Sequence, residues 1–216
     1  MNIVNFTIDG KQIFAPAGRK VLWIALEEGF YIPHLCALEE MNIPYGGCRM
    51  CFVEVEGIEE PVLSCNLSAE DGLAIRTDTP QVRKLQKRAF ELLLSNHPLP
   101  CKGCHAHGKC SLQEIALHLH FKLAHPRLEK INKTYPVDSS HPKIIFDPNY
   151  CILCGLCVYM CNEVEKARAI NFERRGIETK VGTFKNIPLS QTSCTGCMKC
   201  VNVCPVGAFR RKEENC

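Results

Sequence analysis

The sequence predicts an α+β chain made of three small domains, and three observations support this. Residues 2–9 alternate between polar and apolar side chains, which is typical of a half-buried strand. Apolar side chains recur at helical spacing in two later stretches, 19–28 and 79–93. The third observation is the cysteine content, sixteen in 216 residues, and most of these cysteines stand in short runs. Short runs of this kind indicate small domains built around metal ligands.

The composition excludes several classes of protein. A net charge of +3 is too small to indicate a nucleic-acid-binding chain. No stretch approaches the roughly 20 consecutive apolar residues that a membrane helix needs. The N-terminus has no basic segment followed by an apolar run, so we expect no signal peptide. The cysteines are therefore predicted to be ligands in a reducing compartment, and the expected location is the cytoplasm.

Residues 1–78 are predicted to form the first domain, a small α+β fold of the β-grasp kind. Asp9-Gly10 is a hairpin turn signal between the first strand and a second one at 12–15. The helix at 19–28 is expected to end at Gly29. Short strands are expected to follow at 51–56, 61–65 and 73–75.

Four cysteines of this domain form the candidate ligand set of a [2Fe–2S] cluster. Their spacing is C-x11-C-x2-C-x13-C, whereas plant-type ferredoxins use C-x4-C-x2-C and a distant fourth cysteine. Gly46-Gly47 suits a loop whose backbone N–H groups approach the sulfur atoms closely. A zinc site with four cysteines is the alternative. The four residues are Cys36, Cys48, Cys51 and Cys65.

Residues 79–120 are predicted to form a small helical domain. Thr79-Pro80 is an N-cap followed by proline in the first turn of a helix. The apolar stripe of that helix is predicted to be Val82, Leu85, Ala89, Leu92 and Leu93. Arg83, Lys84, Lys87 and Arg88 lie on another face, which is either simply solvated or a docking surface for an acidic partner. A second, shorter helix is expected to be capped by Ser111.

The loop between these two helices carries a second candidate ligand set, one histidine and three cysteines. It consists of His97, Cys101, Cys104 and Cys110, in the pattern H-x3-C-x2-C-x5-C. Zinc accepts such a set, but the neighbouring cysteine runs favour a [4Fe–4S] cluster with His97 as the unusual ligand. His105 and His107 compete for that role, although we expect them to face solvent or to support the ligands.

A linker at 121–140 is predicted to lead into the third domain, 141–216, where C-x2-C-x2-C-x3-C occurs twice. This is the ligand run of a two-cluster ferredoxin, in which the fourth cysteine of each run serves the other cluster. One [4Fe–4S] cluster is therefore assigned to Cys151, Cys154, Cys157 and Cys204. The other is assigned to Cys161, Cys194, Cys197 and Cys200. Zinc is again the alternative, although its sites usually pair two distant C-x2-C motifs.

Three further features of the third domain carry expectations. Asn162 stands where the first run would usually have proline, and we expect it to change only the local turn. The insert between the runs, around Arg174-Arg175-Gly176, is predicted to be a hairpin. Cys216 has no ligand partners and is predicted to be a free thiol. No G-x-G-x-x-G, Ser-His-Asp or paired-carboxylate arrangement is found, so the sequence predicts an electron conductor without a catalytic site.

The order of these motifs resembles one family over nearly the whole chain, the N-terminal part of the large iron–sulfur subunit of respiratory complex I. The same segment begins iron-only hydrogenases and the catalytic subunits of some NAD-linked formate dehydrogenases. The resemblance rests on residues 32–36, 48–51, 96–99, 108–113 and 151–161. In the complex I subunit the last region usually binds one cluster, whereas both full cysteine runs are present here. The chain is therefore most similar to the iron–sulfur subunit of the diaphorase part of soluble NAD(P)-linked [NiFe] hydrogenases.

The resemblance implies a relay with one [2Fe–2S] and three [4Fe–4S] clusters. Its expected partners are a flavin subunit that oxidises NAD(P)H and the small subunit of a hydrogenase, with no further molybdopterin or hydrogen-cluster domain in this chain. The equivalent subunit of an NAD(P)-linked formate dehydrogenase or an electron-bifurcating complex is the alternative function. A zinc-stabilised interaction module is a third hypothesis, from a different functional class.

Overall fold

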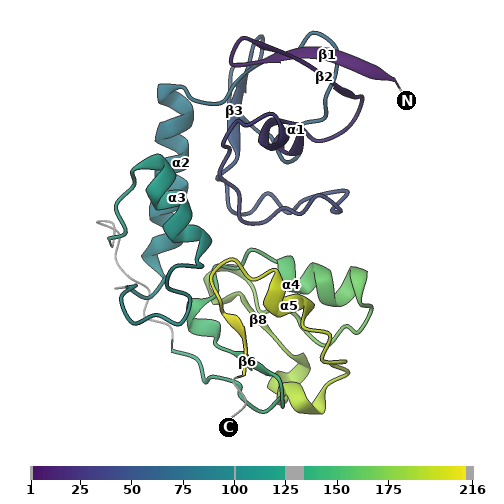
Figure 1. The fold of residues 1–216 in the computed structure, drawn as a ribbon. Coiled ribbons are helices and arrows are strands. Elements are labelled where there is room, and N and C mark those ends of the chain that lie inside the picture. The colour runs from purple at the N-terminus through teal and green to yellow at the C-terminus, as the bar shows by residue number, and fades with distance from the viewer. Residues whose placement is uncertain (1, 100, 125–133, 213–216) are drawn as a thin grey trace. The chain divides into compact units, whose positions relative to one another are not determined.

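A computed structural model of the protein describes residues 2–99, 101–124 and 134–212. The chain forms two compact units, Met1–Leu92 and Leu93–Cys216 (Figure 1). The predicted free thiol Cys216 and the central part of the predicted linker, 125–133, lie outside the described residues. The predicted domain boundaries stay predictions.

The first unit is built on a mixed five-stranded sheet. Its strands are β1 (Ile3–Ile8), β2 (Lys11–Pro16), β3 (Phe52–Val55), β4 (Val62–Leu63) and β5 (Ala74–Arg76). They are ordered β2-β1-β5-β3-β4, with β1 and β5 parallel and the other pairs antiparallel. Asp9 and Gly10 both have positive φ at the β1–β2 turn, the conformation that the hairpin signal predicts. The predicted strands are thus confirmed, with ends shifted by a residue or two.

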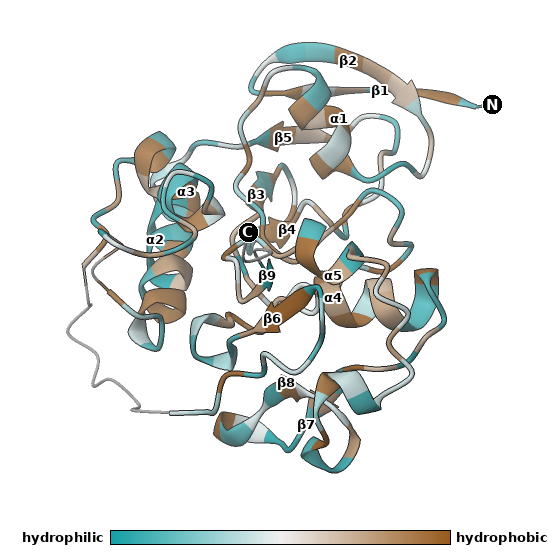
Figure 2. Cartoon of the chain, turned by 60° about the horizontal axis from the view of Figure 1, so that its bottom comes forward, coloured by the Kyte–Doolittle hydropathy of each residue, from teal (hydrophilic) through white to brown (hydrophobic). Residues whose placement is uncertain are grey.

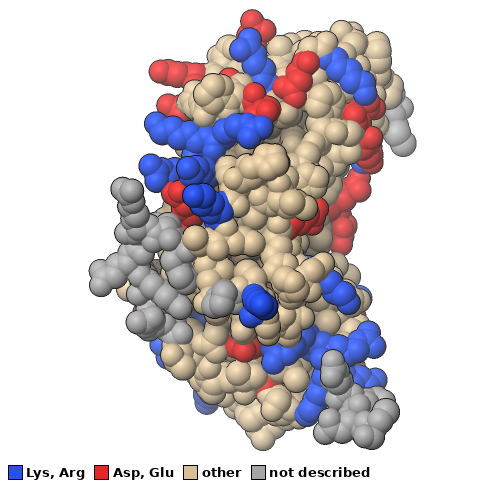
Figure 3. All heavy atoms as spheres, turned by 60° about the vertical axis from the view of Figure 1, so that its left-hand side comes forward, with Lys and Arg blue, Asp and Glu red and all other residues tan. Residues whose placement is uncertain are grey.

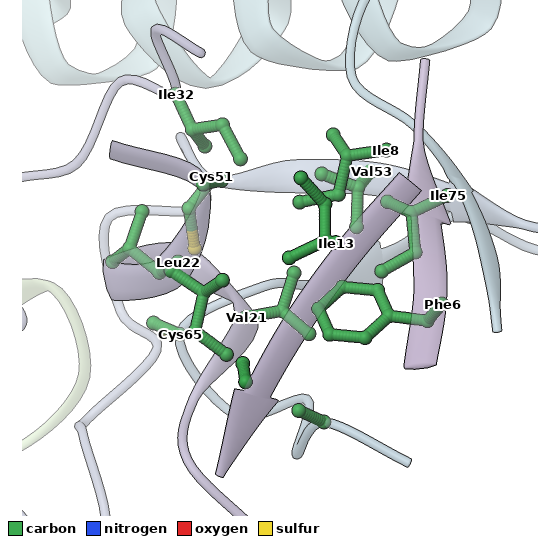
Figure 4. Packing of buried hydrophobic residues seen from close by; sticks show 14 of the residues in the cluster. Phe6, Ile8, Ile13, Val21, Leu22, Ile32, Cys51, Val53, Cys65 and Ile75 are labelled. Atoms are coloured by element: carbon green, nitrogen blue, oxygen red, sulfur yellow. The ribbon is translucent and has the colours of Figure 1, made fainter. Parts of the chain in front are cut away.

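A single helix, α1 (Val21–Glu27), shares a hydrophobic core with this sheet. Phe6, Val21 and Ile75 are at most 1% exposed, and Cys51 and Cys65 lie in the same cluster (Figure 4). Gly29 adopts φ +87° directly after the helix, which confirms the predicted glycine stop. The core therefore holds two of the predicted ligand cysteines among apolar side chains.

Helix α2 (Pro80–Ser95) begins as predicted, because the Thr79 hydroxyl accepts a hydrogen bond from the Val82 N–H at 3.2 Å. The predicted apolar stripe is wrong at one position. Leu92 is 61% exposed, while Phe90 and Leu94 are each 1% exposed. Figure 2 shows hydrophilic and hydrophobic residues alternating along this helix, as expected for an amphipathic element.

The basic face of α2 is exposed and partly neutralised. Arg83 pairs with Asp78, and Arg88 pairs with Glu91 at 2.9 Å. Figure 3 displays acidic side chains close to basic ones on this face of the molecule. These contacts favour the solvated interpretation of the basic face over a docking surface.

The second unit contains α3 (Ser111–Leu119), α4 (Leu156–Tyr159) and α5 (Lys199–Asn202). Its strands form two pairs, β6 (Ile144–Phe146) with β9 (Phe209–Arg211), and β7 (Asn171–Glu173) with β8 (Lys180–Gly182). The pair β7–β8 confirms the predicted hairpin in the insert. Asn162 lies in a π-helical turn, Met160–Val164, that continues from α4. A proline at this position would have no backbone N–H to donate.

The N-cap of α3 differs from the prediction. Cys110 occupies the N-cap position and Ser111 is the first helical residue. No side-chain hydrogen bond caps the helix, and the Gln113 N–H donates to the Cys110 carbonyl at 2.9 Å. A candidate ligand therefore stands at the N-cap position that was predicted for Ser111.

Candidate iron–sulfur sites

The first candidate site lies in the N-terminal unit, where all four predicted cysteines are buried. The Sγ atoms of Cys36 and Cys48 are 3.3 Å apart, and a second close thiol pair is formed by Cys51 and Cys65. The Cys48 thiol, with help from backbone N–H groups, lowers the pKa of the Cys36 thiol to about 6. The pKa of Cys48 and of Cys51 is raised, because each shares a hydrogen bond with the neighbouring thiol and is buried.

A backbone N–H group donates to the sulfur of Cys36, that of Cys48 at 3.4 Å. The N–H groups of Gly47 and Gly46 also contribute to the lowered pKa of the Cys36 thiol. Gly46 has φ +63°, and a Cβ there would lie 3.1 Å from Leu63 Cδ1, so a side chain would be both strained and crowded. The predicted role of Gly46-Gly47, a close approach of the backbone to sulfur, is thus present in the structure.

The second candidate site gathers three cysteines in the second unit. Burial raises the pKa of Cys110, and the nearby Cys101 and Cys104 add to this. Cys104 accepts a hydrogen bond from the Ala106 N–H at 3.5 Å. His97 is 5% exposed and its ring meets Tyr150 edge to face, with 5.8 Å between ring centres. The charge of Cys104 also acts on the Tyr150 phenol, so His97 and Cys104 share this aromatic neighbour.

The three histidines of this region have different environments. His97 is buried, whereas His105 and His107 are exposed. His105 donates through Nε2–H to the Gly207 carbonyl at 2.7 Å, since a carbonyl oxygen can only accept. His107 Nδ1 lies 3.3 Å from the amide nitrogen of Gln113, in the first turn of α3. The side chains that the sequence expected to face solvent or to support the ligands do so.

The third candidate site brings together three cysteines of the first run and one from the second. Burial raises the pKa of Cys157, and the charges of Cys151, Cys154 and Cys204, and also that of Cys200 from the fourth site, raise it further. Burial also raises the pKa of Cys151 to about 11. The Leu153 N–H, which donates to the Cys151 sulfur at 3.4 Å, acts in the opposite direction and lowers that pKa. The late cysteine, Cys204, is therefore a neighbour of the first run.

The fourth candidate site combines three cysteines of the second run with one cysteine of the first run. Burial raises the pKa of Cys200 to about 12, and its charged neighbours are Cys194, Cys197 and Cys161. These four cysteines line one cavity together with apolar side chains such as Ile144, Ile170 and Phe209. Cys161 comes from the first run, and its sulfur accepts the Ala169 N–H at 3.3 Å.

An ion pair beside the fourth site was missed by reasoning from the sequence. Glu165 accepts from Lys199 Nζ at 2.7 Å and from the Thr195 hydroxyl at 2.9 Å. Lys199 and Thr195, with a contribution from Cys197, lower the pKa of the Glu165 carboxyl. Lys199 stands within the second cysteine run, but nothing in the spacing of that run points to Glu165.

The chemistry of these residues fits iron–sulfur clusters. All fifteen described cysteines are free thiols. Thiolates are the soft ligands that iron in such clusters prefers, and backbone N–H groups donating to sulfur are a known control on reduction potential. Within the described ranges, no three or more His, Cys, Asp or Glu side chains converge on a site for a single metal ion. Among the same residues, no helix is long and apolar enough to cross a membrane.

Three protein families match successive parts of the chain. Residues 2–80 match a 2Fe-2S iron-sulfur cluster binding domain. Residues 86–122 match the NADH-ubiquinone oxidoreductase-G iron-sulfur binding region. Residues 150–208 match a 4Fe-4S dicluster domain. The expected [2Fe–2S] domain at the N-terminus and the expected dicluster domain at the C-terminus are confirmed.

Curated proteins are similar to this chain over almost its whole length. The chain is 35% identical over 210 residues to the NADPH-Fe(3+) oxidoreductase subunit alpha of Geobacter sulfurreducens, covering 97% of this chain and 24% of that one. It is 33% identical over 217 residues to the NADP-reducing hydrogenase subunit HndD of Solidesulfovibrio fructosivorans, covering 99% of this chain and 37% of the other. The chain thus spans about a quarter to a third of these curated relatives.

A solved structure matches over a larger share of its own length. A chain in the crystal structure of an NAD+-reducing [NiFe]-hydrogenase in the H2-reduced state superposes with a TM-score of 0.86. It is 33% identical, and the match covers 97% of this chain and 87% of that chain. Fold and sequence therefore agree over most of the length of both chains.

Proposed function

Since this chain belongs to the family of iron–sulfur subunits shared by NAD(P)-linked hydrogenases and complex I, we propose that it relays electrons between an NAD(P)H-oxidising flavin subunit and a hydrogenase module. The observation that carries this proposal is the match to the NAD+-reducing [NiFe]-hydrogenase chain, with 87% of that chain covered at 33% identity. The chain's own features agree with a conductor, because its fifteen described cysteines are free thiols that fall into candidate ligand sets.

The proposed cofactors are one [2Fe–2S] and three [4Fe–4S] clusters. Bound clusters of this kind take up and pass on single electrons. The [2Fe–2S] ligands are the four cysteines of the first site, Cys36, Cys48, Cys51 and Cys65. The second site uses His97 with Cys101, Cys104 and Cys110. The third uses Cys151, Cys154, Cys157 and Cys204, and the fourth uses Cys161, Cys194, Cys197 and Cys200.

The protein's contribution at each site is to hold sulfur atoms and to donate hydrogen bonds to them. The four thiols of the first site cannot all ionise without a cationic partner, as the raised pKa values of Cys48 and Cys51 indicate. Bound iron would supply that partner charge. The N–H groups that donate to Cys36 and Cys161 would then favour the charged sulfur and influence the potential of the bound cluster.

The environment of His97 supports its choice as the histidine ligand. It is the buried one of the three histidines in this region, and it shares Tyr150 with Cys104. His105 uses its Nε2–H on a carbonyl, and His107 contacts Gln113. A reducing compartment suits fifteen free thiols, and we propose the cytoplasm as the location of the chain.

The proposal is tested by anaerobic purification of the tagged chain with whatever subunits accompany it. A flavin-containing subunit and a nickel-containing subunit should co-purify, and NAD(P)H should bleach the visible absorbance of this chain only when the flavin subunit is present. A molybdenum- or tungsten-containing partner would favour the formate dehydrogenase alternative and contradict the hydrogenase assignment. Direct bleaching of the isolated chain by NAD(P)H would contradict the relay role itself.

A further inference from the structure

Two segments that flank the ligands of the third site also contact the loop of the second site. Tyr150 stands immediately before Cys151, and Pro205 to Gly207 follow immediately after Cys204. Both segments meet the loop that carries Cys101, Cys104 and Cys110. The second and third sites are therefore joined by contacts close to their proposed ligands.

His105 makes the most specific of these contacts. Its Nε2–H donates to the carbonyl oxygen of Gly207 at 2.7 Å. Its ring also meets the ring of Tyr150 edge to face, with the centres 4.8 Å apart. His105 therefore contacts both segments that border the third site, Gly207 by a hydrogen bond and Tyr150 through its ring.

Gly207 permits the close approach that this hydrogen bond needs. Its φ is +68°, and an added Cβ would lie 3.1 Å from both His105 Nε2 and the Ala106 Cβ. A second bond fastens the same segment, because the Ser111 N–H donates to the Pro205 carbonyl at 2.8 Å. The contact surface is thus closely packed and hydrogen-bonded at two points.

Tyr150 extends this contact to the proposed histidine ligand. The centre of its ring lies 5.8 Å from the centre of the His97 ring and 4.8 Å from the centre of the His105 ring. One aromatic ring, covalently next to Cys151, therefore touches both the ligand of the second site and the residue that holds the loop in place.

We propose that His105 is a positioning residue that fastens the second-site loop to Gly207 and Tyr150 and so sets the coupling between the clusters of the second and third sites. It does this without binding iron. The proposal rests on the relay function given above and extends it, because it names the contact on which electron exchange between these two sites depends.

The loss of His105 is expected to loosen the contact and leave both ligand sets complete. Removing one hydrogen bond and one aromatic contact should raise the frequency of local opening about fivefold to tenfold. The Ser111 amide reports this directly, since its bond to Pro205 crosses the same contact.

The test uses the full chain, purified anaerobically with its clusters, as His105→Ala, His105→Gln and His107→Ala variants. His107→Ala is the matched control, because His107 is an exposed histidine of the same loop whose ring contacts Gln113 of α3. His105→Gln keeps an N–H donor of similar reach. The three readouts are iron and sulfide content, the spin–spin interaction between reduced clusters in the EPR spectrum, and hydrogen exchange at the Ser111 amide.

The proposal predicts unchanged iron content in all three variants. His105→Ala should weaken the spin–spin interaction and speed exchange at Ser111 about fivefold to tenfold, with partial recovery in His105→Gln and no change in His107→Ala. Loss of about four iron atoms in His105→Ala would identify His105 as a ligand and overturn the proposal. An unchanged EPR interaction with full iron content would also overturn it. Absence of iron from the unmodified protein would refute the relay function instead, so the two failures are distinguishable.

Discussion

Replacing the last cysteine of either run should damage the site formed mainly by the other run. Cys161→Ala removes a residue of the first run, but its sulfur lies with Cys194 and Cys200. Cys204→Ala removes a residue of the second run, but its charge acts on Cys151 and Cys157. The structure therefore predicts a crossed pattern of cluster loss.

The size of the effect follows from the ligand sets. The unmodified chain should hold about 14 iron atoms, and each single variant should fall to about 10 because one four-iron cluster loses a ligand. The unfilled sulfur position also leaves a backbone donor without its acceptor, the Ala169 N–H in the case of Cys161→Ala. Glu163→Ala and Asn202→Ala are suitable controls, since both are exposed residues beside these cysteines and should retain all of the iron.

EPR spectroscopy of the reduced protein decides which cluster is missing. Reference spectra come from Cys154→Ala for the third site and Cys197→Ala for the fourth. The spectrum of Cys161→Ala should match that of Cys197→Ala, and the spectrum of Cys204→Ala should match that of Cys154→Ala. The opposite pairing would refute the exchange of cysteines between the runs.

Three further outcomes are expected. His97→Ala should lose the iron of the second site alone, whereas His97→Cys should keep a four-iron cluster with an altered potential in a redox titration; unchanged iron in His97→Ala would mean that the ligand is another residue. Lys199→Gln should lower the reduction potential of the fourth cluster and Glu165→Gln should raise it, because a positive charge favours the reduced form; shifts of the same sign would contradict the role of this ion pair. Phe6→Ala should destabilise the first unit by about 3–5 kcal/mol in denaturant titrations that follow its cluster absorbance, and Phe14→Ala, at a position 68% exposed, should have almost no effect.

The sequence predicts the backbone elements where local chemistry decides them. Alternation in β1, the Asp9-Gly10 turn and the Thr79 cap are all short-range signals, and each corresponds to an observed element. Leu92 and Phe90 lie about 200° apart around the helix axis and so face nearly opposite sides of α2, but both are apolar, and periodicity alone does not say which of them is buried. Which of them is buried depends on tertiary packing, which the local pattern does not contain.

The candidate sites also contain features that a local pattern predicts and features that depend on tertiary packing. Cysteine spacing indicates four candidate sets, because a ligand run is a local pattern with a fixed geometric demand, and the assignment of ligands to each cluster stays a prediction. The N-cap role of Cys110, the Glu165–Lys199 pair and the contact of His105 with Gly207 join residues through their surroundings rather than through a motif. His105 and Gly207 are 102 positions apart, so no window of the sequence could relate them.

The central claim, that this chain is an iron–sulfur relay, is tested most directly by the iron, zinc and acid-labile sulfide content of the anaerobically purified protein. The account predicts about 14 iron atoms per chain, with matching sulfide and no zinc. About four zinc ions without sulfide would contradict it and identify the chain as a zinc-stabilised interaction module.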